Sequence, residues 1–170
     1  GADGPTHHGL YDLAYLRCLP NIILMAPKDE NELRRMLMTA LYCGHPAALR
    51  YPRGNGLGVA LEEPITPLPL GKGELLREGS DLLLCALGAM VAPALRIAES
   101  LAEEGIACAV INARFVKPMD ETLIHAWASR CRAIVTLEEG CAPAGFGGAV
   151  AESLADAGLA RPLLRCAVAD

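Results

Sequence analysis

The chain has 170 residues, which suits one ordinary domain or two small ones. Hydrophobic residues make up 52% and charged residues 21%, a globular composition that excludes intrinsic disorder. A formal net charge of −5 and an aromatic content of 4% argue against nucleic acid, anionic lipid and base-stacking ligands. A few arginines could still hold small anions locally.

The sequence also indicates a compartment. The longest apolar runs, 82–87 and 106–111, are strand-length and too short to cross a membrane. The chain opens without a charged and apolar leader, so we expect no secretion signal. Its seven cysteines form no CxxC pair, and several lie inside apolar runs. These features predict reduced, buried thiols in a cytoplasmic protein, without a disulfide framework or a zinc site.

The first part of the chain alternates helical and strand patterns after an opening loop rich in glycine. Asp29 is a plausible helix cap, because acidic residues follow it and apolar residues then recur at helical spacing up to Gly44. Short apolar runs on either side are typical of buried strands. The expected elements are a helix over 10–19, a strand over 21–26, a helix over about 30–44 and a strand over 47–51.

A proline-rich linker is expected over residues 55–71, because proline removes backbone donors and cannot occupy the middle of a sheet. Beyond it, strands alternate with helices of ten or more residues, which predicts an α/β fold with a mainly parallel sheet flanked by helices. The expected strands are 75–77 at an edge, 81–86, 107–111, 133–137 and 163–168. The expected helices are one with Pro93 in its first turn ending near Gly105, then 120–130 and 147–157.

The opening loop concentrates groups that could do chemistry: Asp3, Thr6, His7 and His8 lie among glycines. Glycine lets a ligand approach the backbone, and imidazoles titrate near neutral pH, so a histidine here could shuttle protons at a bound substrate. A surface loop whose polar groups only satisfy turn donors fits the same pattern, and from chemistry alone it is favoured. Adjacent histidines without further ligands are a poor metal site.

A second concentration follows the strand predicted at 47–51, in the segment Arg50-Tyr51-Pro52-Arg53-Gly54-Asn55. Loops after the carboxyl ends of parallel strands bind ligands in α/β proteins, and an arginine fork suits a phosphate or a carboxylate. A surface arginine paired with an acidic side chain is the alternative, and composition does not decide between them.

Two further features invite a functional reading that we do not adopt. The glycines at 145, 147 and 148 resemble a dinucleotide-binding turn, but Val150 stands where a small residue is needed. They are better explained as easing the start of a helix. Glu138 and Glu139 could be an acid–base pair or a cation ligand, but such a pair more often caps or salt-bridges neighbouring elements, so we assign it no catalytic role.

Several motifs together resemble the C-terminal part of the 1-deoxy-D-xylulose-5-phosphate synthase family, over essentially all 170 residues. Those specific to that family are Asp3-Gly-Pro-Thr-His-His-Gly9 and Arg50-Tyr-Pro-Arg-Gly-Asn55. Those shared among transketolase-like enzymes include Ala113-Arg-Phe-Val-Lys-Pro-Met-Asp120 and Thr136-Leu-Glu-Glu-Gly140.

The resemblance implies a fold, a reaction and an assembly. Residues 1–54 match the end of a pyrimidine-binding domain, and residues 72–170 match a transketolase C-terminal domain without its closing helix. The family condenses pyruvate and glyceraldehyde 3-phosphate with loss of carbon dioxide to give 1-deoxy-D-xylulose 5-phosphate, a precursor of isoprenoids, thiamine and pyridoxal. It uses thiamine diphosphate and Mg²⁺ and is a homodimer.

The resemblance also implies roles for three residues. His7 matches the histidine that faces the reactive carbon of the cofactor and the aldehyde acceptor, where it aids proton transfer and stabilises the developing alkoxide. Asp3 matches the aspartate that contacts the hydroxyl groups of the acceptor. Arg53 matches an arginine that binds the substrate phosphate. His8 stands at a position where the family accepts other polar residues, so it receives no role.

The family's diphosphate and magnesium motif, its activating glutamate and its other phosphate-binding arginine would all lie upstream of Gly1. We therefore expect no cofactor-binding or metal-binding residue in this chain, and we expect the chain alone to be inactive. Two alternatives remain: an E1 β subunit of a 2-oxoacid dehydrogenase complex, and a non-catalytic assembly domain. The two specific motifs favour a sugar-phosphate acceptor over the first alternative.

Overall fold

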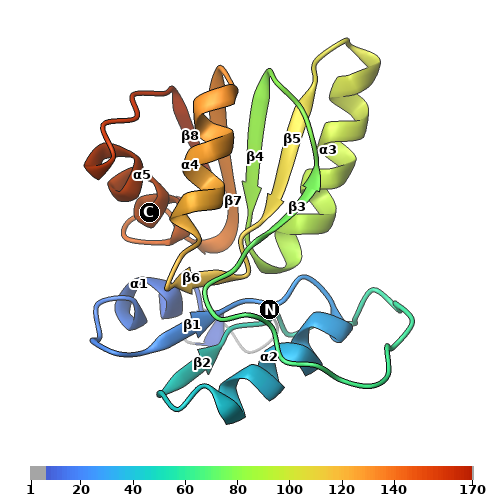
Figure 1. Cartoon of the computed structure of the whole chain (residues 1–170), viewed down its shortest axis with the longest axis vertical. Coiled ribbons are helices and arrows are strands. Elements are labelled where there is room, and N and C mark those ends of the chain that lie inside the picture. The colour runs from blue at the N-terminus through green and yellow to red at the C-terminus, as the bar shows by residue number, and fades with distance from the viewer. Residues whose placement is uncertain (1–6, 170) are drawn as a thin grey trace.

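The computed structural model describes residues 7–169 and contains two sheets, one toward each end of the molecule (Figure 1). The larger sheet has five strands, and all neighbours except β3 and β5 run parallel. This confirms the predicted mainly parallel sheet. Its strands, in spatial order, are β3 (Glu74–Arg77), β5 (Cys108–Asn112), β4 (Leu82–Ala86), β7 (Ala133–Cys141) and β8 (Leu163–Val168).

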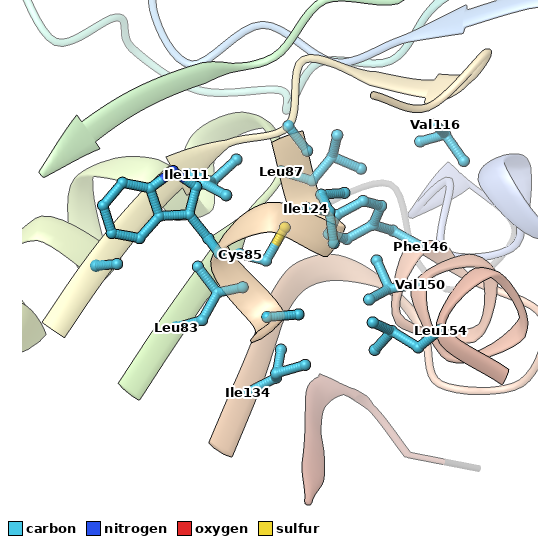
Figure 2. Close-up of a cluster of buried hydrophobic side chains, with 14 of the residues drawn as sticks. Leu83, Cys85, Leu87, Ile111, Val116, Ile124, Ile134, Phe146, Val150 and Leu154 are labelled. Carbon is cyan, nitrogen blue, oxygen red and sulfur yellow. The ribbon is translucent and has the colours of Figure 1, made fainter. Parts of the chain in front are cut away.

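Helices cover both faces of this sheet. On β4, Leu84 and Ala86 pack with α3 (Val91–Glu103), which follows a 3₁₀ turn, η2 (Gly88–Met90). The alternate residues Leu83 and Cys85 face α4 (Glu121–Arg130) and α5 (Phe146–Asp156), as Figure 2 shows. This alternation is the period of two expected for a strand buried on both faces, and each face excludes water from the sheet.

The smaller sheet has the order β2 (Ala47–Leu49), β1 (Ile23–Met25) and β6 (Phe115–Lys117), and it is accompanied by α1 (Asp12–Leu16) and α2 (Glu30–Tyr42). The start of α2 is the one predicted, since the Asp29 side chain accepts a hydrogen bond from the Glu32 N–H at 2.7 Å. β1 and β2 run parallel, so their carboxyl ends lie at the same edge.

Strand β6 was not predicted, and it joins the two halves of the chain. After leaving the large sheet at the end of β5, the chain turns at Arg114, which has a φ of 60°, and then pairs antiparallel with β1. The Ala26 N–H donates to the Arg114 carbonyl at 2.9 Å. Three residues followed by Pro118 give too short a pattern for a strand to be recognised, so only the tertiary partner reveals it.

Several elements differ in length from the sequence prediction: the strands predicted over 21–26 and 47–51 are shorter, as β1 and β2, and two other elements differ most. The helix predicted over 10–19 is helical only over α1, because the Leu10 carbonyl accepts from the Cys141 N–H and Lys117 binds the carbonyls of Arg17 and Leu19. Strand β7 extends to Cys141 rather than ending at 137, through an irregularity after which Cys141 pairs with Val168. Two glutamates and a glycine at 138–140 concealed this extension.

The proline-rich segment contains no helix or strand, and it lies along α2. Leu68 is 3% exposed within a core shared with Met36 and Phe115. Its N–H donates to the Thr39 hydroxyl at 2.7 Å, and the Gly58 N–H donates to Glu30 at 2.6 Å. These contacts fix the path of the segment between the two sheets.

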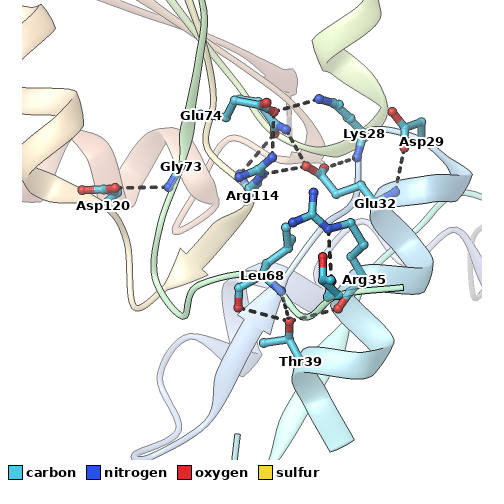
Figure 3. Close-up of polar contacts among 12 residues, drawn as sticks. Lys28, Asp29, Glu32, Arg35, Thr39, Leu68, Gly73, Glu74, Arg114 and Asp120 are labelled. Atoms are coloured by element: carbon cyan, nitrogen blue, oxygen red, sulfur yellow. Dashed lines mark hydrogen bonds and ion pairs between the residues drawn. The ribbon is translucent and has the colours of Figure 1, made fainter. Parts of the chain in front are cut away.

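A buried polar network joins α2 to the turn before β6 (Figure 3). The Glu32 carboxylate, 3% exposed, accepts from Arg114 Nε at 2.6 Å, from Asn112 Nδ2 at 2.9 Å and from the Lys28 N–H at 2.7 Å. Arg114 also binds Glu74 at 2.8 Å, and Lys28 Nζ lies 2.8 Å from the same carboxylate oxygen. A buried charge is tolerated because each of its neighbours is hydrogen-bonded.

Glu74 gives this network a pH dependence. Burial acts to raise its pKa, but Lys28 and Arg114 outweigh that effect and hold the pKa below its ordinary value of 4.5. Its contribution to stability is therefore present above about pH 4.5 and is lost as the pH falls through the folded-state pKa. Because the side chain is 35% exposed, we expect an effect of less than about 1 kcal/mol.

Urea unfolding at pH 7 and pH 3.5 tests this prediction with Glu74→Gln. The parent chain should lose more stability between the two pH values than the variant does. Glu78→Gln, at a nearby exposed carboxylate, is the control and should behave like the parent. Equal losses in the parent and in Glu74→Gln would contradict the assignment.

Candidate functional site

An open cavity of about 940 Å³ is lined by two parts of the chain. The first part precedes the proline-rich segment, and the second part follows it. From the first part come the segment that starts at His7, the floor formed by β1 and β2, and the loop after β2. From the second part come the 3₁₀ turn, the end of β7 and the end of β8. The polar lining residues are His7, His8, Asp12, Tyr15, Arg50, Tyr51, Arg53, Glu138 and Glu139, and the apolar ones include Leu16, Leu24, Leu49 and Met90.

The histidine segment reaches this cavity through two local constraints. Gly9 has a φ of +64°, and a Cβ there would lie 2.7 Å from the Asp12 carboxylate, so only glycine fits the turn without strain. The next residue, Leu10, is held to the large sheet by its carbonyl, which accepts from the Cys141 N–H at 2.9 Å. His7 is exposed at the rim and His8 is half-buried. Asp3 lies outside the described residues.

The arginine segment reaches the same cavity from β2. The Arg50 N–H donates to the Met25 carbonyl at 2.8 Å, which extends the pairing of β2 with β1 by one residue. The chain then leaves the sheet, and Arg53 is exposed on the cavity wall. The structure thus brings His7 and Arg53, 46 positions apart in the sequence, to one cavity.

Glu138 and Glu139 have the structural roles that the sequence favoured. The two oxygens of Glu138 accept from the N–H groups of Phe146 at 2.9 Å and Gly147 at 2.8 Å, so Glu138 caps the start of α5. Burial raises the pKa of Glu138, although these N–H groups act to lower it. Glu139 forms an ion pair with Arg50.

The glycines after these carboxylates have the role predicted for them. Gly145 is the cap residue of α5, and a Cβ on Gly147 would lie 2.5 Å from the Thr136 hydroxyl. They allow the helix to begin close against the sheet, and no dinucleotide fingerprint is needed to explain them.

Sequence reasoning missed two contacts in the cavity lining. The Arg50–Glu139 ion pair spans 89 positions, and it closes the cavity wall between β2 and β7. The Tyr15 hydroxyl donates to Asp12 at 2.9 Å, and this hydrogen bond raises the pKa of Tyr15. The helical spacing of Asp12 and Tyr15 predicts that they are neighbours, but it does not show that they face a cavity.

The lining has the chemistry of a site for an anionic, hydroxylated ligand. Guanidinium groups offer planar donors to a phosphate, imidazoles donate or accept protons, and the apolar floor excludes water. Among residues 7–169, no group of three or more histidine, cysteine, aspartate or glutamate side chains could hold a metal ion.

Four of the seven cysteines are buried, which confirms the prediction of buried thiols: Cys85, Cys108, Cys131 and Cys141. Burial raises the pKa of Cys85 to about 12, so this thiol is unreactive at neutral pH. Within the described part of the chain, no helix has the length and apolar character needed to span a membrane.

Two family models match this chain. The model described as transketolase, pyrimidine binding domain, matches residues 1–57, and the model described as transketolase, C-terminal domain, matches residues 71–170. The chain belongs to the transketolase family. This confirms the fold class expected from the motifs, and domains of this family imply dependence on thiamine diphosphate in general.

Two curated relatives of this chain share one name. A 1-deoxy-D-xylulose-5-phosphate synthase of Thermosynechococcus vestitus is 61% identical over 172 residues, and one of Thermomicrobium roseum is 60% identical over 171 residues. Both alignments cover 100% of this chain and 27% of the relative. This transketolase-family chain therefore spans about a quarter of the length of the curated relatives it matches.

Solved structures agree with the assignment. A chain titled split gene transketolase, inactive beta4 tetramer, superposes with a TM-score of 0.84 at 33% identity, covering 95% of this chain and 53% of that one. A transketolase mutant from Pichia stipitis superposes with a TM-score of 0.63 at 22% identity and supports the fold alone.

Proposed function

We propose that this chain is the part of a 1-deoxy-D-xylulose-5-phosphate synthase that receives the aldehyde acceptor. The complete enzyme would join pyruvate to glyceraldehyde 3-phosphate with loss of carbon dioxide. In this proposal Arg53 binds the acceptor phosphate, His7 handles the proton of the acceptor carbonyl, and Asp3 contacts the acceptor hydroxyl groups.

The observation that carries the proposal is the shared cavity of His7 and Arg53. A triose phosphate has an aldehyde at one end and a phosphate at the other. A site that binds it therefore needs one side chain for each end, within one cavity. The arginine supplies a planar fork for the phosphate, and the imidazole can donate or accept a proton at the aldehyde end. The same-named relatives, identical at about three positions in five, support this choice.

Thiamine diphosphate would supply the carbanion that attacks the acceptor carbonyl. The apolar floor and the histidine fit the reacting end of such a cofactor, but residues 7–169 offer no cluster for a magnesium diphosphate. We propose that another part of the complete synthase holds the diphosphate and Mg²⁺. We further propose that the complete synthase is a homodimer in the cytoplasm. The chain alone would then be inactive.

An E1 β subunit of a 2-oxoacid dehydrogenase complex is the second candidate. Such an enzyme passes its acyl group to a lipoyl group, which carries no phosphate, so it has no use for a phosphate-binding arginine at this wall. The exposure of Arg53 at the cavity and the names of the relatives favour the synthase.

The substitution Arg53→Ala tests the proposed phosphate contact. The host is the complete synthase, or the Thermosynechococcus relative with this chain replacing its matched segment. We expect the KM for glyceraldehyde 3-phosphate to rise about 10- to 100-fold while the KM for pyruvate stays nearly unchanged, because one charge-assisted contact is lost. The measurement is steady-state formation of the product at varied concentrations of each substrate.

Unphosphorylated glyceraldehyde distinguishes a phosphate contact from a general disturbance, since its kcat/KM should hardly respond to Arg53→Ala. Arg96→Ala, at an exposed arginine of α3, is the control and should leave both KM values unchanged. Equal effects of Arg53→Ala on both substrates would overturn the phosphate role. The isolated 170-residue chain, assayed in parallel, should show no turnover.

A further inference from the structure

The end of β7 contacts each segment that carries a proposed site residue. The Cys141 N–H holds the Leu10 carbonyl, three residues after His7, and Glu139 holds the Arg50 side chain, three residues before Arg53. The part of the chain that matches the C-terminal domain thus fixes both edges of a cavity whose proposed reacting groups come from the other part.

We propose that Glu139 is a positioning residue for the acceptor phosphate, acting through Arg50. This inference rests on the proposed function, because it assigns the phosphate to Arg53. Glu139 lies on the same cavity wall and pairs with Arg50, from which the loop of Arg53 continues. Its effect is to fix where that loop leaves β2.

The Arg50–Glu139 ion pair is partly buried, and this increases its energetic importance. The Arg50 side chain is 14% exposed and that of Glu139 is 29% exposed. Water therefore competes weakly for the two charges, and breaking the pair costs more than breaking an exposed pair. If either partner loses its charge, the pair no longer fixes the point where the loop of Arg53 leaves β2.

The backbone makes the loop depend on this pair. β2 ends at Leu49, and Arg50 makes the last hydrogen bond to β1. Beyond it come Pro52, Arg53 and then Gly54, with no helix or strand to hold them. The ion pair with Glu139 holds the side chain of the same residue that makes this last hydrogen bond, so it fixes the starting point of the loop.

The chain provides a control in Glu152, whose side chain is 64% exposed. Its ion pair with Arg17 also joins the first part of the chain to the second, from α5, but it lies at a different cavity. Glu152→Gln makes the same chemical change as Glu139→Gln without touching the proposed site. A general effect of loosening the two parts would appear in both variants.

The test is steady-state kinetics of Glu139→Gln, Arg50→Met, their double variant and Glu152→Gln in the complete synthase. We expect Glu139→Gln to raise the KM for glyceraldehyde 3-phosphate about tenfold, with kcat and the KM for pyruvate within about twofold. Arg50→Met should have a similar effect, and the double variant should be no worse than either single variant, because both remove one contact. Glu152→Gln should match the parent.

Two results would overturn the inference. One is a Glu139→Gln enzyme whose kinetics equal those of Glu152→Gln. The other is a double variant whose loss is the product of the two single losses, since Arg50 and Glu139 would then act separately. Arg53→Ala, measured beside them, separates this inference from the proposed function: if it leaves the KM for glyceraldehyde 3-phosphate unchanged, the phosphate site itself is wrong.

Discussion

Replacing His7 by glutamine should lower kcat/KM of the complete synthase for glyceraldehyde 3-phosphate by about 10²- to 10⁴-fold, the range for loss of a general acid or base. Glutamine keeps a polar side chain of similar reach but cannot exchange a proton near neutral pH. Because the proton is moved in the transition state rather than on binding, most of the loss should appear in kcat.

The adjacent histidine provides the control for this experiment. His8 lies in the same turn and lines the same cavity, but it has been assigned no role. His8→Gln should therefore stay within about threefold of the parent enzyme. If both substitutions lower kcat/KM equally, the effect belongs to the shape of the turn and not to the proton chemistry of His7. If neither substitution lowers kcat/KM, the assignment of His7 is wrong.

The substitution with the largest expected effect on stability is Arg114→Met. It removes the guanidinium from the Glu32 carboxylate, which is 3% exposed and 2.6 Å from Arg114 Nε. Methionine keeps much of the volume, and, like arginine, it carries a Cβ at the positive φ of this position. The free energy of unfolding should fall by about 3–5 kcal/mol, because a buried carboxylate is left without its cation.

Denaturant unfolding monitored by the fluorescence of Trp127 measures this effect. Arg132→Met is the matched control, because the Arg132–Asp81 pair is 3.6 Å long and the Arg132 side chain is 85% exposed. That variant should lose at most about 1 kcal/mol. Similar losses in both variants would show that burial adds nothing to the Glu32–Arg114 pair.

Local patterns predicted most of the larger sheet, because β4, β5 and the first part of β7 are mainly apolar runs bounded by turns. They also predicted the start of α2, where Asp29 has a side chain suited to capping. Both signals reside in a few consecutive residues. The family motifs added the two segments that meet at the cavity.

The features that sequence reasoning missed depend on partners far away in the chain. Strand β6 exists only because β1 offers its edge, and the extension of β7 depends on its pairing with β8. The Arg50–Glu139 pair has no local signature, since either residue alone reads as an ordinary surface charge. The polar contacts between the two halves were therefore invisible until the fold was known.

The crossing of β6 from one sheet to the other restricts how this protein can be recombined with its relatives. An exchange of everything after residue 71 would also replace a strand of the smaller sheet and the arginine that neutralises Glu32. Chimeras joined in the proline-rich segment should therefore succeed only when the incoming half brings a compatible β6 and Arg114. The two halves depend on each other structurally, although separate family models match them.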